Sequence, residues 1–148
     1  MSMKQLDTLY RFEQDKETNA AQQLQIAEVD YQQNIQRLNS VSDYRLEYMK
    51  RLNQRALEGI DSITYSHFHT FLLKLDKAAE QVKIALTQAK ALVEQRKKLW
   101  LQQRQKVQAV ELLRDKKLKA LSVIANKREQ NMFDEIATQQ FVRRKLRE

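Results

Sequence analysis

Only one glycine, Gly59, and no proline occur in the 148 residues of this chain, so it has almost none of the residues that make turns. Charged residues account for 31% of it, and much of the remainder is Gln, Leu and Ala. This composition is typical of long helices and coiled coils. Gly59 lies between two periodic segments, where glycine can end a helix because it adopts a left-handed backbone conformation cheaply. The chain is therefore predicted to reverse direction once, next to Gly59.

Apolar residues recur at alternating steps of three and four after Gly59, the spacing of a coiled-coil seam. The predicted seam of the second half runs through Phe68, Phe71, Leu75, Ala78, Val82, Ala85, Ala89, Leu92, Arg96, Leu99, Gln103, Lys106, Val110, Leu113, Lys117, Ala120 and Ile124. The seam of the first half alternates less strictly and runs through Ala20, Leu24, Ala27, Tyr31, Ile35, Leu38, Val41, Tyr44, Tyr48 and Leu52. Polar residues interrupt it before Ala20, so we expect that end to be less firmly held.

These patterns predict an all-α fold in which two long helices form an antiparallel coiled-coil hairpin. The helices are expected at about residues 4–57 and 64–145, with a loop at about 58–63, in a single domain spanning residues 1–148. Asp61, Ser62 and Thr64 are favourable types for the start of the second helix. A short connection favours antiparallel neighbours. At 1.5 Å per residue the helices are roughly 80 Å and 120 Å long.

The unequal helix lengths predict an overhang. A reversal near residue 61 places Leu52 near Phe71, Tyr48 near Leu75 and Tyr44 near Ala78. Residues beyond about 120 then have no partner within the chain, although an isolated helix is marginal unless its apolar face is covered. The apolar residues of this overhang that need a partner are Ile124, Met132, Phe133, Ile136 and Phe141.

The residue types needed for catalysis are scarce. The chain has no cysteine, and its two histidines, His67 and His69, are two residues apart and so point to opposite sides of a helix. A two-helix rod also offers no cleft in which carboxylates acquire shifted pKa values. We therefore expect no enzymatic activity, no metal site and no cofactor. The N-terminus has no apolar signal segment and no stretch is long enough to span a membrane, so a cytoplasmic protein is expected.

The net charge of +8 is concentrated in residues 96–119, which contain nine basic and two acidic residues. This stretch is either a solvated face or a contact for an acidic protein surface, with anionic lipid as a weaker partner. Nucleic acid is not expected, because aromatic platforms do not alternate with the basic residues. Trp100 either covers the edge of the seam or anchors a partner. Likewise, the aromatic layer of Tyr44, Tyr48, Phe68 and Phe71 is either core or an exposed docking patch.

Four segments in this order resemble the FliJ family of the bacterial flagellar type III export apparatus. They are DYRLEYMKRL (43–52), YSHFHTFLLKLDKAAEQV (65–82), KKLWLQQRQKVQAVELL (97–113) and NKREQNMFDEIATQQF (126–141). The resemblance extends over nearly the whole chain and includes a Tyr pair before the loop and a Trp followed by basic residues. Asn131 departs from the family, which often has Lys after the position of Gln130.

The resemblance implies a non-enzymatic stalk that inserts into the hexameric flagellar export ATPase ring and promotes its assembly and activity. It also implies binding to the cytoplasmic domain of the export gate protein FlhA and to export chaperones, and a peripheral location at the cytoplasmic face of the inner membrane. By resemblance, the gate-binding residues are Tyr44, Tyr48, Phe71, Leu75 and Ala78. The residues expected to contact the ATPase ring are Phe133, Ile136, Phe141, Arg143, Arg144, Lys145 and Arg147.

Three other functions remain open from the sequence. The first is the stalk of an injectisome type III secretion system, which has a similar architecture. A coiled-coil chaperone or scaffold without an ATPase partner is a second alternative. A basic nucleic-acid-binding protein is the third, and its binding would depend steeply on salt.

Overall fold

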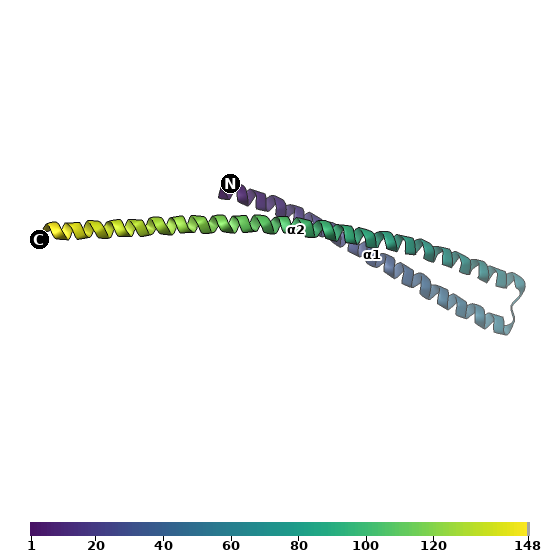
Figure 1. Cartoon of the computed structure of the whole chain (residues 1–148). Helices are drawn as coiled ribbons and strands as arrows, with labels where there is room; N and C mark the ends of the chain where they lie inside the picture. Colours follow the sequence, from purple (N-terminus) through teal and green to yellow (C-terminus); the bar gives the residue numbers. More distant parts are fainter. Residues whose placement is uncertain (148) are drawn as a thin grey trace. The chain divides into compact units, whose positions relative to one another are not determined.

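A computed structural model describes residues 1–147 as two long helices, α1 (Met3–Glu58) and α2 (Ser62–Arg147), joined by residues 59–61 (Figure 1). No strand occurs in this part of the chain. The predicted all-α hairpin is therefore confirmed. Each helix begins and ends within two residues of the expected positions, and the connection is shorter than expected. Whether the chain is one domain stays a prediction.

Side chains define where each helix starts. Before α1, the backbone N–H of Gln5 donates to Ser2 Oγ at 3.1 Å, and the N–H of Ser2 donates to Gln5 Oε1 at 3.0 Å. This reciprocal pair is a capping box. Before α2, the N–H of Thr64 donates to Asp61 Oδ1 at 3.2 Å. Hydrogen bonds from the side chain and backbone of Thr64 lower the pKa of Asp61 below its usual value.

Gly59 ends α1 with the left-handed backbone conformation that its position in the sequence predicts. Its φ is +93°, in the left-handed region that other residues rarely adopt. A Cβ atom at this position would have no heavy atom within 4 Å, so backbone conformation, not lack of space, is what favours glycine here. The single glycine therefore stands where the chain reverses.

The helices form two compact units, each with a thin core. The loop unit comprises residues 18–102, and its buried residues are Ala27, Asn34, Leu52, Leu72 and Ala89. The terminal unit comprises residues 1–17 and the chain from residue 103 onward, and its buried residues are Leu6, Val107 and Val110. In both units α1 and α2 run antiparallel: in the loop unit Arg45 contacts Asp76 and Tyr48 contacts Phe68, and in the terminal unit Asp7 contacts Arg114 and Glu13 contacts Gln103.

The covered face of α2 follows both rows of the predicted seam as far as Ala89, and one row stays covered farther on, through Arg96, Gln103, Val110 and Lys117. The other row, Leu92, Leu99, Lys106 and Leu113, is exposed, and the positions one residue later are covered instead: Val93, Trp100, Val107 and Arg114. A straight helix has 3.6 residues per turn, so it drifts from a strict seven-residue repeat by about 20° per heptad. The seam prediction was therefore wrong for this row. On α1, every predicted seam residue except Tyr44 is buried or half-buried.

Candidate docking surfaces

An aromatic cluster lies near the loop and joins α1 to α2. The ring of Tyr48 lies 4.9 Å from that of Phe68 and 4.6 Å from that of Phe71, measured between centroids. Tyr44 lies 6.4 Å from Tyr48 and meets Phe71 edge-on at 6.1 Å. Tyr48 thus contacts two rings that lie nearer the loop than Leu75, the residue expected beside it from the sequence.

The members of this cluster differ in exposure. Tyr44 is 48% exposed, whereas Tyr48, Phe68 and Phe71 are half-buried. The cluster is thus both core and surface: Tyr48 mainly holds the helices together, and Tyr44 presents half of its side chain to solvent. Leu75 and Ala78, the other two residues expected at the gate-binding surface, are also half-buried.

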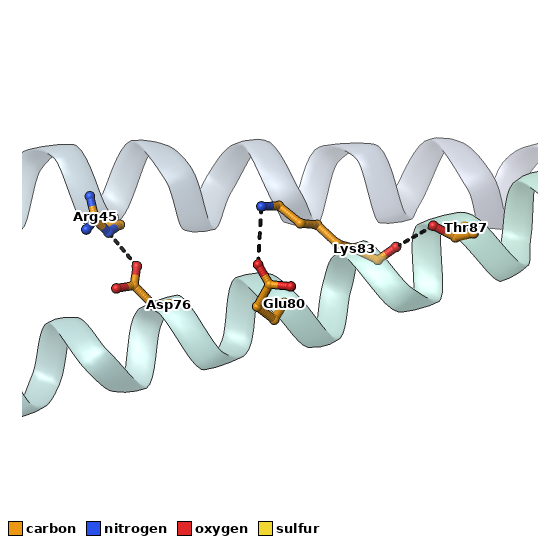
Figure 2. A network of polar contacts seen from close by, with 5 residues as sticks. All are labelled: Arg45, Asp76, Glu80, Lys83 and Thr87. Atoms are coloured by element: carbon orange, nitrogen blue, oxygen red, sulfur yellow. Dashed lines mark hydrogen bonds and ion pairs between the residues drawn. The ribbon is translucent and has the colours of Figure 1, made fainter.

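A row of polar contacts extends along α2 from Asp76 to Thr87 and includes Arg45 of α1 (Figure 2). Arg45 Nε of α1 donates to Asp76 Oδ1 of α2 at 2.6 Å, and this pair links the two helices. Farther along α2, Lys83 Nζ lies 3.4 Å from Glu80 Oε1, and Thr87 Oγ1 donates to the backbone oxygen of Lys83 at 3.0 Å. Such exposed pairs add little stability, so the Arg45–Asp76 pair mainly fixes the register of the helices beside the cluster.

The second surface is the uncovered end of α2 in the terminal unit, which we call the overhang (residues 118–147). Every one of these residues is exposed, and in Figure 1 the yellow end of α2 has no part of α1 beside it. Phe133 and Phe141 are 64% and 63% exposed, and the Nζ of Lys145 lies 5.5 Å from the ring centroid of Phe141. The exposed residues include all seven expected to contact the ring: Phe133, Ile136, Phe141, Arg143, Arg144, Lys145 and Arg147.

Polar contacts next to the overhang fasten the start of α1 to α2. Arg114 Nε donates to Asp7 Oδ1 at 2.6 Å, and the Arg114 guanidinium lies 5.1 Å from the ring centroid of Tyr10. Gln103 Nε2 donates to the backbone oxygen of Glu13 at 2.9 Å and to its carboxylate at 2.5 Å. Sequence reasoning did not identify the contact of Arg114, because it placed Leu113, rather than Arg114, on the seam; it placed Gln103 on the seam but gave it no partner.

Neither histidine forms part of a chemical site. Both are exposed, and His69 stacks on Tyr65 with its centroid 6.4 Å away and the planes 6° apart. Across residues 1–147, no group of three or more His, Cys, Asp or Glu side chains is placed to hold a metal ion. No helix in that range is long and apolar enough to cross a membrane. Among the basic residues of 96–119, Arg96, Arg114 and Lys117 are half-buried and the others are exposed.

Comparison with known proteins identifies the family. The family described as "Flagellar FliJ protein" matches residues 3–146, nearly the full length. This chain belongs to the FliJ family. It is 30% identical to the flagellar FliJ protein of Salmonella typhi over 139 residues, which cover 94% of this chain and 95% of that relative. It is 28% identical to the flagellar FliJ protein of Escherichia coli (strain K12) over 113 residues, which cover 76% and 77% of the two chains. No solved structure matches.

Membership of the FliJ family makes this chain a component of flagellar protein export that associates with the export apparatus and is not an enzyme. It also favours the flagellar system over the injectisome stalk. The aromatic cluster and the overhang are the two candidate surfaces for its contacts within the apparatus.

Proposed function

We propose that this chain is a stalk and adaptor of the flagellar type III export apparatus. Its overhang inserts into the ring of the hexameric export ATPase and promotes assembly and activity of the ring, and its aromatic cluster binds the cytoplasmic domain of the export gate protein FlhA. Export chaperones are further partners. Through these partners the chain works in the cytoplasm at the face of the inner membrane.

The observation that carries this proposal is the overhang, in which every residue from 118 to 147 is helical and exposed, including the large apolar residues Met132, Phe133, Ile136 and Phe141. An isolated helix with uncovered apolar residues is marginal in water, so a partner that covers them stabilises it. A ring pore covers such a helix from all sides. A single helix in a sixfold ring also contacts the subunits unequally, and thereby biases which of them close on nucleotide.

The mechanism is mechanical and stoichiometric. The stalk contributes no reacting group; it lowers the free energy of the assembled ring relative to separate ATPase subunits by binding only the assembled form. The aromatic cluster lies in the loop unit, apart in the sequence from the overhang, so the two surfaces can be altered independently. Tyr44 is the member of the cluster best placed for gate binding, because half of it is accessible.

ATP turnover by the cognate export ATPase, measured with and without this protein, tests the stalk function. We expect stimulation at ratios below one stalk per ATPase subunit, and loss of stimulation when residues 122–148 are deleted while the rest of the chain stays helical by circular dichroism. Undiminished stimulation by the truncated protein rules out the overhang as the ring contact. If a competent ATPase is not stimulated by the full chain, the function shifts to an adaptor between gate and chaperones.

A gate-binding assay tests the second surface. The double variant Tyr44→Ala/Phe71→Ala is expected to weaken binding to the FlhA cytoplasmic domain and to leave ATPase stimulation intact. Equal loss of both activities refutes the separation of the two surfaces. In cells, loss of either activity is expected to reduce flagellar export and hence motility, which swimming in soft agar measures.

A further inference from the structure

One face of α2 runs without interruption from the covered part of the terminal unit into the overhang. Its covered part comprises Gln103, Val107, Val110 and Arg114, which are spaced by three or four residues and are buried or half-buried. The same spacing continues beyond the start of α1, and the next residues on this face are Leu118, Leu121, Ala125, Arg128, Met132 and Ile136. We call these six residues the uncovered stripe. All of them are exposed, because α1 does not extend over them.

The covered part shows which chemistry this face accepts. Two apolar positions, Val107 and Val110, are buried in the same unit as Leu6 of α1. The arginine that follows them, Arg114, is bound by the carboxylate of Asp7 at 2.6 Å. Here the face is occupied by an antiparallel helix that provides an apolar residue and a carboxylate next to each other in sequence.

The uncovered stripe repeats this pattern. Arg128 lies two heptads after Arg114, and Arg143 follows at nearly the same interval, so the arginines share one face of the helix. Val107 and Val110 precede Arg114 by seven and four residues, and Leu121 and Ala125 precede Arg128 by seven and three. Arg143 follows Met132 and Ile136 by eleven and seven residues, so the face contains two further arginines that come after apolar positions and that α1 does not cover.

The charge of the overhang favours an acidic occupant over a second copy of the chain. Residues 118–147 contain seven basic residues and three acidic ones. If two overhangs paired antiparallel about their centre, the arginines near the C-terminus of one would approach Lys119 of the other. Like charges at such positions oppose pairing.

We infer that the uncovered stripe binds an amphipathic helix whose apolar residues are flanked by carboxylates, lying antiparallel to α2 and continuing the line of α1. The carboxylates of this partner helix pair with Arg128 of the stripe and with Arg143, which lies farther along the same face, as Asp7 pairs with Arg114. The inference rests on the proposed function only in treating the overhang as a partner-binding segment. To the proposed function it adds which face of the overhang binds and which chemistry the partner has. Met132 and Ile136 lie on this face, whereas Phe133 and Phe141 lie on other sides of the helix.

Binding of two synthetic peptides to the full-length chain tests the inference. Both are helical and share one leucine stripe, but one has Glu and the other Lys at the flanking positions; fluorescence anisotropy measures their binding. We expect the Glu peptide to bind and the Lys peptide to bind about tenfold more weakly, since each exposed pair contributes little by itself but several attractive pairs become repulsive ones in the Lys peptide. Equal binding of both peptides, or no binding of the Glu peptide up to about 1 mM, overturns the inference.

Paired variants test which face is used. Arg128→Glu is expected to weaken binding of the Glu peptide by about tenfold, because an attractive pair becomes a repulsive one, whereas Lys127→Glu, the same charge change at a position outside the stripe and about 100° around the helix from Arg128, changes it by less than about threefold. Met132→Ser is expected to weaken binding, and Val123→Ser, outside the stripe, is its control. Similar losses for Arg128→Glu and Lys127→Glu indicate a diffuse attraction and refute the assigned face. Circular dichroism of each variant confirms that the helices are retained.

The same variants separate this inference from the proposed function. If Arg128→Glu abolishes peptide binding but the export ATPase is not stimulated even by the unaltered chain, the inference holds and the stalk function fails. If the unaltered chain stimulates the ATPase and Arg128→Glu stimulates it equally, the stalk function holds and the stripe is not its contact.

Discussion

Truncation of the two tyrosines of the aromatic cluster is expected to have very different effects on stability. The ring of Tyr48 packs against two rings at 4.9 and 4.6 Å, and each such pair contributes about 0.5–1.5 kcal/mol beyond its buried area. With the loss of packing, Tyr48→Ala is expected to cost about 3 kcal/mol. Tyr44 has ring neighbours at 6.1 and 6.4 Å and is 48% exposed, so Tyr44→Ala is expected to cost only about 1 kcal/mol.

Thermal unfolding followed by far-ultraviolet circular dichroism measures this difference. For a chain of this size, 1 kcal/mol shifts the midpoint by about 2–4 °C, so Tyr48→Ala is expected to melt about 4–8 °C below Tyr44→Ala. Tyr65→Ala is a suitable control, because Tyr65 is 51% exposed and stacks on His69 of the same helix. It is expected to change the midpoint least.

Binding to the FlhA cytoplasmic domain, measured on the same variants, completes the test. If Tyr44 is a docking residue, Tyr44→Ala weakens binding by more than its small effect on stability accounts for, while it remains fully folded at the assay temperature. Equal melting points for Tyr44→Ala and Tyr48→Ala refute the division of this cluster into a structural and a docking residue. Wild-type gate binding by Tyr44→Ala refutes its docking role alone.

Three further substitutions test the connection between the helices and the core. Gly59→Ala is expected to lower the free energy of unfolding by about 1–2 kcal/mol in urea titrations, since φ is +93°, and an unchanged value contradicts the backbone argument. Because hydrogen bonds from Thr64 lower the pKa of Asp61, the stabilisation by this carboxylate is complete above its usual pKa of about 3.9 and is lost as pH falls through the lowered value. The melting-point difference between wild type and Asp61→Asn should therefore shrink below about pH 4, and a constant difference would oppose this account. Asn34 is 5% exposed, and its Nδ2 donates to the backbone oxygen of Asp30. Because an apolar residue at a buried seam position stabilises but specifies the pairing less strictly, Asn34→Leu is expected to raise the free energy of unfolding by about 1 kcal/mol and to give more mispaired species in sedimentation analysis. A lower melting point counts against this expectation.

The sequence by itself determined that the chain forms helices and where it reverses. With one glycine and no proline, only one position offered a favourable helix end, and Gly59 takes the positive φ expected there. The 3–4 spacing likewise identified the covered face of α1 and of α2 as far as Ala89, because these patterns follow from helix geometry alone. The overhang followed from the unequal lengths of the two periodic segments.

One row of the covered face of α2 beyond Ala89 was decided only by tertiary structure. Counting in heptads assumes an exact seven-residue repeat, whereas a straight helix departs from that repeat by about 20° per heptad. The count therefore selected Leu92 and Leu113, although Val93 and Arg114 are the covered residues. The polar contact of Arg114 with Asp7 depends on which residues of two distant segments meet, and the spacing within either segment does not give this. That contact in turn reveals the chemistry of the face that continues into the overhang, because composition and spacing give the position of an arginine but not the group that binds it.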